Sequence, residues 1–274
     1  MNDSNNPWPP GQRCGVLVTV NFDAESVDLR HVEPENLCGR FSYGRYGMRA
    51  GLARVLALLR EQALAATFFV PALDAENNAS QVEAILRDGH EVAARGYAYE
   101  DYSQLGAAEP ETLTRAHAAL TRIAGRPPRG WRAPGGLLSP GTLPHLGALG
   151  YRYDSSFQDD DYPYVMRCPA GQELVELPVF QALDDATLYG LHHTQARLLK
   201  TWTEEFDAMY AAGTLVTLTL HVRGDYGSGR ASRVAAVREF LDHVRAKPGV
   251  FFMTCEAMAD WWAAQHPHTE PAPV

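Results

Sequence analysis

Residues 15–22, which read GVLVTVNF, decide the fold. The run is almost entirely apolar and rich in Val, which is typical of a strand buried in a parallel sheet. Polar residues follow it at once, beginning with Asp23 and Glu25. We therefore expect a buried strand whose carboxyl end carries chemically useful side chains.

Strand-like and helix-like segments alternate along the rest of the chain. Leu52, Val55, Leu56 and Leu59 recur at helical spacing after the first strand. Further strands are predicted at 66–70, 91–94, 130–133, 174–179, 215–221 and 250–253, and helices at 82–88, 110–124, 139–149, 196–212, 234–244 and 255–262. This alternation predicts an α/β fold in which crossover helices wind or close a parallel sheet into a barrel.

One domain accounts for this pattern, because no flexible linker or shift in composition divides the chain. We expect it to span residues 15–265, with a flexible N-terminal segment (1–14) and a flexible Pro-rich tail (266–274). Barrels of this kind place reactive residues at the carboxyl ends of their strands.

The bulk composition excludes several classes of partner. The 274 residues carry a net charge of −9, and Lys and Arg do not cluster, so no nucleic-acid partner is expected. No apolar run approaches the length of a membrane span. The four cysteines are scattered without a CxxC pair, and the first residues do not resemble a signal peptide. We therefore expect a cytoplasmic protein that does not contact membranes.

The end of the first strand offers an alternating row of polar groups. In an extended chain Asn21, Asp23 and Glu25 point the same way, with Leu17 and Thr19 continuing the row inward. Two carboxylates there could supply a base and a metal ligand or electrostatic anchor. The alternative is a turn that Asp23 caps.

Two further strand ends carry candidates. His221 follows Thr217 and Thr219 on one side of its strand, although a single His is more often structural than catalytic. Arg132 lies between Trp131 and Ala133-Pro134, where it could clamp a carboxylate of the substrate or of Asp23. A surface salt bridge is the alternative. Tyr162 and Tyr164 belong to an acidic, aromatic loop that could line a pocket.

Seven segments occur in the order found in a known superfamily: VNFDAES, TFFVPA, DGHEVAARGYAYED, GWRAPGG, GYRYDSSFQDDDYPY, VELPV and LTLH. From about Gly15 to Trp262 the chain thus resembles the polysaccharide deacetylase (NodB-homology) superfamily, most of all its intracellular cyclic-imide and ureide hydrolases. The resemblance implies a (β/α)-barrel of about seven strands that hydrolyses a non-peptide C–N bond.

The resemblance also assigns roles by position. Asn21 and Asp23 match two acids, the catalytic base and a metal ligand. Arg95 and Tyr99 match two His ligands of the metal. Arg132 matches the Arg that orients the base, and His221 matches a late His that acts as general acid.

These replacements change the expected chemistry. A bound zinc needs about three protein ligands, and Arg is permanently protonated and cannot be one. We therefore expect neither a metal nor a cofactor. Arg95 would stand near Asp23 in place of the ion, Tyr99 would donate a hydrogen bond, and Glu25 or His221 would serve as base.

The segment 41–47, FSYGRYG, resembles the family loop that reaches over the pocket. Tyr43 and Arg45 are candidate substrate contacts, because an aromatic face and a fork of donors suit a small planar or anionic ligand. Alternatively, the loop packs on a neighbouring subunit, which agrees with an expected homo-oligomer.

The sequence therefore favours a metal-independent hydrolase, or a related lytic enzyme, acting on a small amide, cyclic imide or ureide. The superfamily includes a metal-independent allantoinase branch. The alternatives are a non-catalytic binding protein that retains the old pocket and, less favoured, a metal-dependent polysaccharide deacetylase.

Overall fold

A strongly curved, mostly parallel sheet forms the centre of the computed structural model, which describes residues 6–168, 171–267 and 269–271. The strand order is β10-β6-β7-β5-β4-β3-β2-β1-β8, with β9 paired to the start of β1. Only β6 and β7 pair antiparallel. The strands are β1 (Cys14–Asn21), β2 (Thr67–Val70), β3 (Glu91–Ala94), β4 (Gly130–Trp131), β5 (Tyr153–Asp154), β6 (Tyr164–Arg167), β7 (Glu173–Glu176), β8 (Val216–His221), β9 (Val250–Met253) and β10 (Thr269–Pro271).

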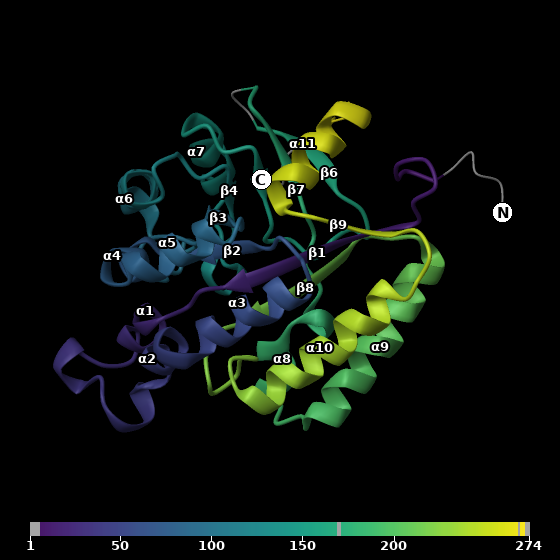
Figure 1. Cartoon of the computed structure of the whole chain (residues 1–274). Helices are drawn as coiled ribbons and strands as arrows, with labels where there is room; N and C mark the ends of the chain where they lie inside the picture. Colours follow the sequence, from purple (N-terminus) through teal and green to yellow (C-terminus); the bar gives the residue numbers. More distant parts are fainter. Residues whose placement is uncertain (1–5, 169–170, 268, 272–274) are drawn as a thin grey trace.

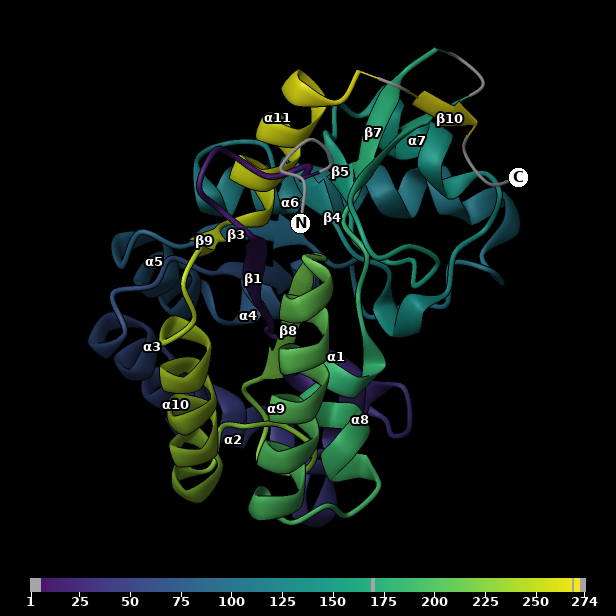
Figure 2. The same ribbon diagram turned by 90° about the vertical axis from the view of Figure 1, so that its right-hand side faces the viewer.

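Helices cover the outer face of this sheet (Figures 1 and 2). In both views α9 and α10 lie side by side beneath β8. In Figure 1, α4, α5 and α6 lie to the left of β2 and β3. The α-helices are α1 (Glu25–Leu29), α2 (Tyr43–Tyr46), α3 (Leu52–Glu61), α4 (Ala72–Asn77), α5 (Ala79–Arg87), α6 (Glu109–Ala124), α7 (Thr142–Ala148), α8 (Asp185–Gly190), α9 (Gln195–Ala212), α10 (Ala231–Arg245) and α11 (Cys255–Gln265).

The expected α/β fold of the (β/α)-barrel type is confirmed, and the curved sheet forms a half-barrel. The described chain contains ten strands rather than about seven. The three additional strands are β5, β6 and β10, whose sequences YD, YVMR and TEP lack the longer apolar context that marked most of the expected strands. The predicted ends of α6 and α9 are confirmed by Gly125 and Gly213, which stop these helices in the left-handed region at φ 74° and 80°.

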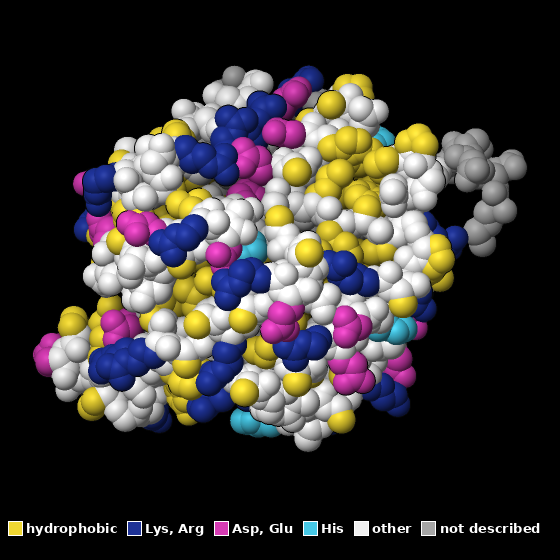
Figure 3. Space-filling model, in the orientation of Figure 1, with side chains coloured by type: hydrophobic (Ala, Val, Ile, Leu, Met, Phe, Trp, Pro, Cys, Tyr) yellow, Lys and Arg dark blue, Asp and Glu magenta, His cyan; other side chains and the backbone are white. Residues whose placement is uncertain are grey.

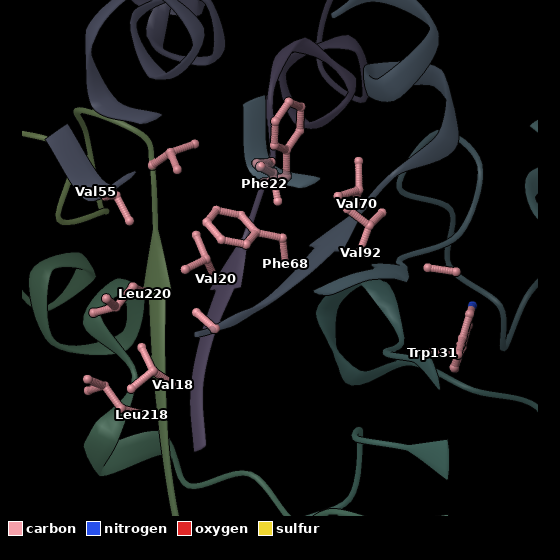
Figure 4. Close-up of a cluster of buried hydrophobic side chains, with 14 of the residues drawn as sticks. Val18, Val20, Phe22, Val55, Phe68, Val70, Val92, Trp131, Leu218 and Leu220 are labelled. Carbon is pink, nitrogen blue, oxygen red and sulfur yellow. The ribbon is translucent and has the colours of Figure 1, made fainter. Parts of the chain in front are cut away.

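The two faces of β1 divide the core. Val16, Val18, Val20 and Phe22 pack outward against helices and neighbouring strands, as Figure 4 shows for Val18, Val20 and Phe22. Leu17 belongs to a second apolar cluster inside the half-barrel. The inward row therefore continues through Thr19 to Asn21, as the alternation predicted.

The ends of the chain differ from the expected flexible segments. Trp8 is only 5% exposed and donates its indole N–H to the carbonyl of Gly213, so residues near it are packed rather than free. In the tail, Thr269–Pro271 pairs in parallel with β6. The packed Trp8 secures the N-terminal end, and strand pairing with β6 secures the C-terminal end. Residues 1–5, 268 and 272–274 lie outside the described part.

The surface carries charges of both signs. On the face in Figure 3, Lys and Arg side chains alternate with Asp and Glu rather than forming a patch of one sign. Within the described ranges, no helix combines the length and apolar character needed to cross a bilayer.

Candidate active site

A cavity of about 250 Å³ opens at the carboxyl ends of the central strands. Five residues singled out by the sequence line it: Asn21, Arg95, Tyr99, Arg132 and His221. The segments that follow β4, β5 and β7 supply the other walls, including Ser155, Ser156, Gln158, Gln181 and Asp184. Asp23 lies behind Arg95 and is fully buried. The predicted cluster of polar strand ends therefore exists.

Strand register brings Asn21 and His221 together. They are directly paired across β1 and β8, so their side chains share the inner face. Asn21 Nδ2 lies 2.9 Å from His221 Nε2, and on the other side of the ring His221 Nδ1 lies 2.7 Å from Asp185 Oδ1. The imidazole is thus held from both of its nitrogens.

The surrounding hydrogen bonds select the tautomer of His221. Arg132 can only donate, so Asn21 Oδ1, 3.4 Å from Arg132 Nη1, accepts and Asn21 Nδ2 donates toward His221. His221 Nε2 is then an acceptor, and the proton of the neutral ring is on Nδ1, where it is donated to Asp185. This arrangement directs the basic Nε2 lone pair to the cavity wall, where the Asn21 amide donates to it.

Nearby carboxylates favour protonation of this imidazole. Burial by itself lowers the pKa of His221, but the charges of Asp185, Asp184 and Asp23 and the Asp185 hydrogen bond outweigh it. The pKa of His221 therefore lies above its ordinary value of 6.5. Asp23 Oδ2 is 3.7 Å from Nε2, close enough to stabilise the imidazolium form.

A buried ion pair joins the segments that follow β1 and β3. Arg95 Nε donates to Asp23 Oδ1 at 2.8 Å, and both side chains are 5% exposed or less. Burial lowers the pKa of Arg95, but Asp23 and Tyr99 raise it by more, so its pKa is raised overall. The guanidinium is permanently charged and stands against the carboxylate, as the sequence predicted.

Tyr99 is held at the cavity in a strained conformation. Its φ is 66°, in the left-handed region that a bulky residue rarely adopts. Glu100 supports the turn by accepting from the backbone N–H groups of Tyr97 and Ala98 at 3.0 and 2.8 Å. Tyr99 Oη accepts from Arg95 Nη2 at 3.2 Å, so its own proton remains available. Burial raises the pKa of Tyr99 and keeps the phenol protonated. Such strain often accompanies a functional position.

The residues present do not fit the divalent metal that the family resemblance implies. Of the three matching positions only Asp23 can be a ligand, and its carboxylate is already paired with Arg95. Tyr99 remains protonated and Arg95 would repel the ion.

A second group, Asp184, Asp185 and His221, places suitable atoms within 4.8 Å of one another. Asp185 Oδ2 already accepts from the backbone N–H groups of His221 and Ser228 at 3.0 and 2.7 Å, however. Its other oxygen accepts from His221 Nδ1. One oxygen of Asp185 thus orients the imidazole and the other is held by the backbone, so both are already engaged.

Several sequence candidates do not reach the cavity. The strand ends at Asn21, and Glu25 is the first residue of α1, so it does not continue the row. Glu25 instead pairs with Arg45 at 2.9 Å. Tyr43 begins α2 and is likewise absent from the cavity walls.

The two tyrosines of the acidic loop also lie elsewhere. Tyr162 packs against Trp8 and Trp262, with ring centroids 6.1 and 6.5 Å apart, in the cluster near the amino end of β8. Tyr164 begins β6 and donates its hydroxyl to Asp159 at 2.9 Å. Tyr164 is paired in register with Glu176, the last residue of β7. Neither tyrosine lines the cavity.

Arg132 does not clamp Asp23. It bonds instead to Thr19, Asn21, Thr219 and Ser155. Three residues of the site were not predicted from the sequence. Asp185 is an acid at a helix start and Ser155 belongs to a Ser pair after a strand, which are signals of capping and binding positions. The third is Tyr226, whose ring lies edge-on 5.4 Å from that of His221.

This combination of an α/β half-barrel and an oriented histidine at its carboxyl edge defines a hydrolase-like site. The family model for polysaccharide deacetylases matches residues 42–153. A Mycobacterium smegmatis protein assigned to the polysaccharide deacetylases is 35% identical, with a TM-score of 0.88 over 97% of this chain and 95% of its own. The chain belongs to the polysaccharide deacetylase family and shares its fold.

Two other relatives have different substrates. The Puue allantoinase is 25% identical, with a TM-score of 0.85 over 97% of this chain and 96% of its own. A Helicobacter pylori peptidoglycan deacetylase is 24% identical over 286 residues, covering 92% of this chain and 97% of its own. Family membership identifies the chain as a hydrolase-family protein for C–N bonds other than peptide bonds.

Proposed function

We propose that the protein is a metal-independent hydrolase that cuts a non-peptide C–N bond in a small amide, cyclic imide or ureide. The observation that carries this proposal is the Asp23–Arg95 ion pair beside an oriented His221. Arg95 supplies a fixed positive charge beside Asp23, and His221 Nε2, a base that accepts from the Asn21 amide, lies 3.7 Å from the same carboxylate.

His221 would act as the general base. Water would first replace the Asn21 N–H at Nε2. Nε2 then takes a proton from this water as the water oxygen bonds to the carbonyl carbon, and Asp185 stabilises the imidazolium that forms. Asp23, 3.7 Å from Nε2, adds to this stabilisation. The same proton then passes from Nε2 to the leaving nitrogen as the C–N bond breaks.

Arg95 and Tyr99 would stabilise the negative charge that develops on the carbonyl oxygen. Both line the cavity, and the Tyr99 hydroxyl is free to donate because it accepts from Arg95. Preorganised donors in a buried site are effective because they need no reorganisation during the reaction.

The dimensions of the cavity favour a small substrate. About 250 Å³ is smaller than the roughly 300–1,000 Å³ of pockets that enclose drug-sized ligands. The Puue allantoinase is a relative with a small-molecule substrate in its name. Cytoplasmic location and a homo-oligomeric state stay predictions, which cell fractionation and light scattering test.

A substrate screen tests the proposal. Purified protein is incubated with small amides, cyclic imides and ureides, and ammonia or carboxylate release is measured for wild type and His221→Ala. We expect wild type, but not His221→Ala, to turn over at least one compound class. Circular dichroism checks that both proteins are folded. Binding without turnover by wild type would favour the non-catalytic alternative, and turnover only of acetylated glycans would favour a polysaccharide deacetylase.

A further inference from the structure

Arg132 is a buried cation whose hydrogen-bond partners are all uncharged. Its side chain bonds to Thr19 Oγ1 at 3.0 Å, Asn21 Oδ1 at 3.4 Å and Thr219 Oγ1 at 3.5 Å. It also bonds to the carbonyl and hydroxyl oxygens of Ser155 at 2.9 and 2.8 Å. The residue is 4% exposed, so its charge is separated from bulk water. Burying a charge without a counter-charge is costly.

The other two buried arginines are treated differently. Arg95 is paired with Asp23. Arg223 is paired with Asp28 at 2.7 Å and with Asp225 at 3.0 Å. The described chain therefore compensates two buried guanidinium groups with carboxylates and leaves that of Arg132 without such a partner. Burial accordingly lowers the pKa of Arg132, to about 10, which still leaves it charged at neutral pH.

The uncompensated charge faces the cavity. Arg132 is a wall residue, and each of its Nη atoms carries two N–H groups. Nη2 has one partner in the described chain, Ser155 Oγ, so one N–H is left to donate. Asp184, the acidic residue on the wall, is directed to the backbone N–H of Thr187 at 2.9 Å instead.

Position 21 explains why the charge is uncompensated. An Asp there, as the family resemblance implies for the base, would place a carboxylate 3.4 Å from Arg132. Asn21 keeps the shape of that contact but supplies no charge. A ligand must then provide the missing negative charge.

We propose that the substrate carries a carboxylate, separate from the bond that is cut, and that Arg132 binds it. This inference rests on the proposed function and narrows its substrate class. One Asn21 side chain spans Arg132 and His221, so the carboxylate lies only a few bonds from the scissile carbonyl. The substrate class is therefore a small amido or ureido acid.

The test compares two probes that differ in one charge. Succinamate has a carboxylate and an amide, whereas succinamide has two amides. Their affinities for the full-length protein are measured by isothermal titration calorimetry under conditions without turnover, using short incubations at low temperature. We expect wild type to bind succinamate roughly tenfold or more tightly than succinamide, because a charge-assisted hydrogen bond distinguishes them.

Asn21→Asp supplies the internal counter-charge while keeping side-chain size, and it should remove that preference. Gln181→Glu is the matched control, because it adds the same charge to another part of the cavity wall and should retain most of the preference. Thermal melting shows whether each variant is folded. Equal affinities in wild type, an unchanged preference in folded Asn21→Asp, or binding of neither probe at millimolar concentration would overturn the proposal.

The carboxylate site and the proposed hydrolase activity can be refuted independently of each other. A carboxylate preference without turnover of any compound would leave the anion site standing and remove the proposed hydrolase. Turnover of neutral amides with equal affinity for both probes would do the opposite.

Discussion

Asp185→Asn should inactivate the protein by changing the tautomer of His221. In wild type, one oxygen of Asp185 accepts from two backbone N–H groups, at 3.0 and 2.7 Å, and the other accepts from the imidazole at 2.7 Å. Asn has only one acceptor oxygen. The two backbone donors outnumber the single imidazole contact, so the Asn oxygen turns toward them.

The Asn NH2 group then faces His221 Nδ1 and forces that nitrogen to accept. The ring proton moves to Nε2, which removes the lone pair that would take a proton from water. A wrong-tautomer histidine in a hydrolase lowers kcat by roughly ten-thousandfold, and we expect a loss of that order with little change in KM.

Steady-state kinetics measures the loss, and long-range ¹H–¹⁵N NMR of the imidazole reports which nitrogen carries the proton. A folded Asp185→Asn protein with kcat within threefold of wild type, a margin of only about 0.65 kcal/mol, would refute the assignment of His221 as base. An unchanged tautomer in the NMR spectrum would refute the hydrogen-bond argument by itself.

Four further outcomes are expected. Tyr99→Phe removes a donor to the developing oxyanion and should lower kcat roughly a hundredfold, measured with the best substrate. Because His221 must be neutral to act and its pKa is raised above 6.5, kcat should rise with pH and level off above that raised pKa. The stability that protonated His221 contributes is full below 6.5 and disappears as pH rises through the folded-state pKa, which urea unfolding at several pH values measures. Replacing both Arg95 and Tyr99 by His places two further potential metal ligands beside Asp23. Metal analysis should then find bound zinc in the double variant.

The sequence predicted the part of the site that regular strands carry. Asn21, Arg132 and His221 stand at strand ends, where a period of two and parallel register determine the direction of each side chain. The same periodicity failed at Glu25, because the chain leaves the strand at Asn21 and begins α1 four residues later.

The spacing of residues in the sequence could not predict contacts that depend on tertiary packing. Asp185 reaches His221 from the start of α8, and Tyr162 turns toward Trp8, through chain directions that depend on tertiary packing. The Arg95–Asp23 pair was predictable because each position matched a family motif and their charges are opposite. The absence of a carboxylate partner for Arg132 in the described chain emerged only from the full set of its contacts.

The most direct measurement of the central claim is the hydrolysis rate of the best substrate before and after exhaustive chelation, with the metal content of the same samples. We predict an unchanged kcat, no stoichiometric metal, and no stimulation by added zinc, because Asp23 is already paired with Arg95 and Arg95 cannot be a metal ligand. A stoichiometric zinc whose removal abolishes activity and whose return restores it would contradict the account.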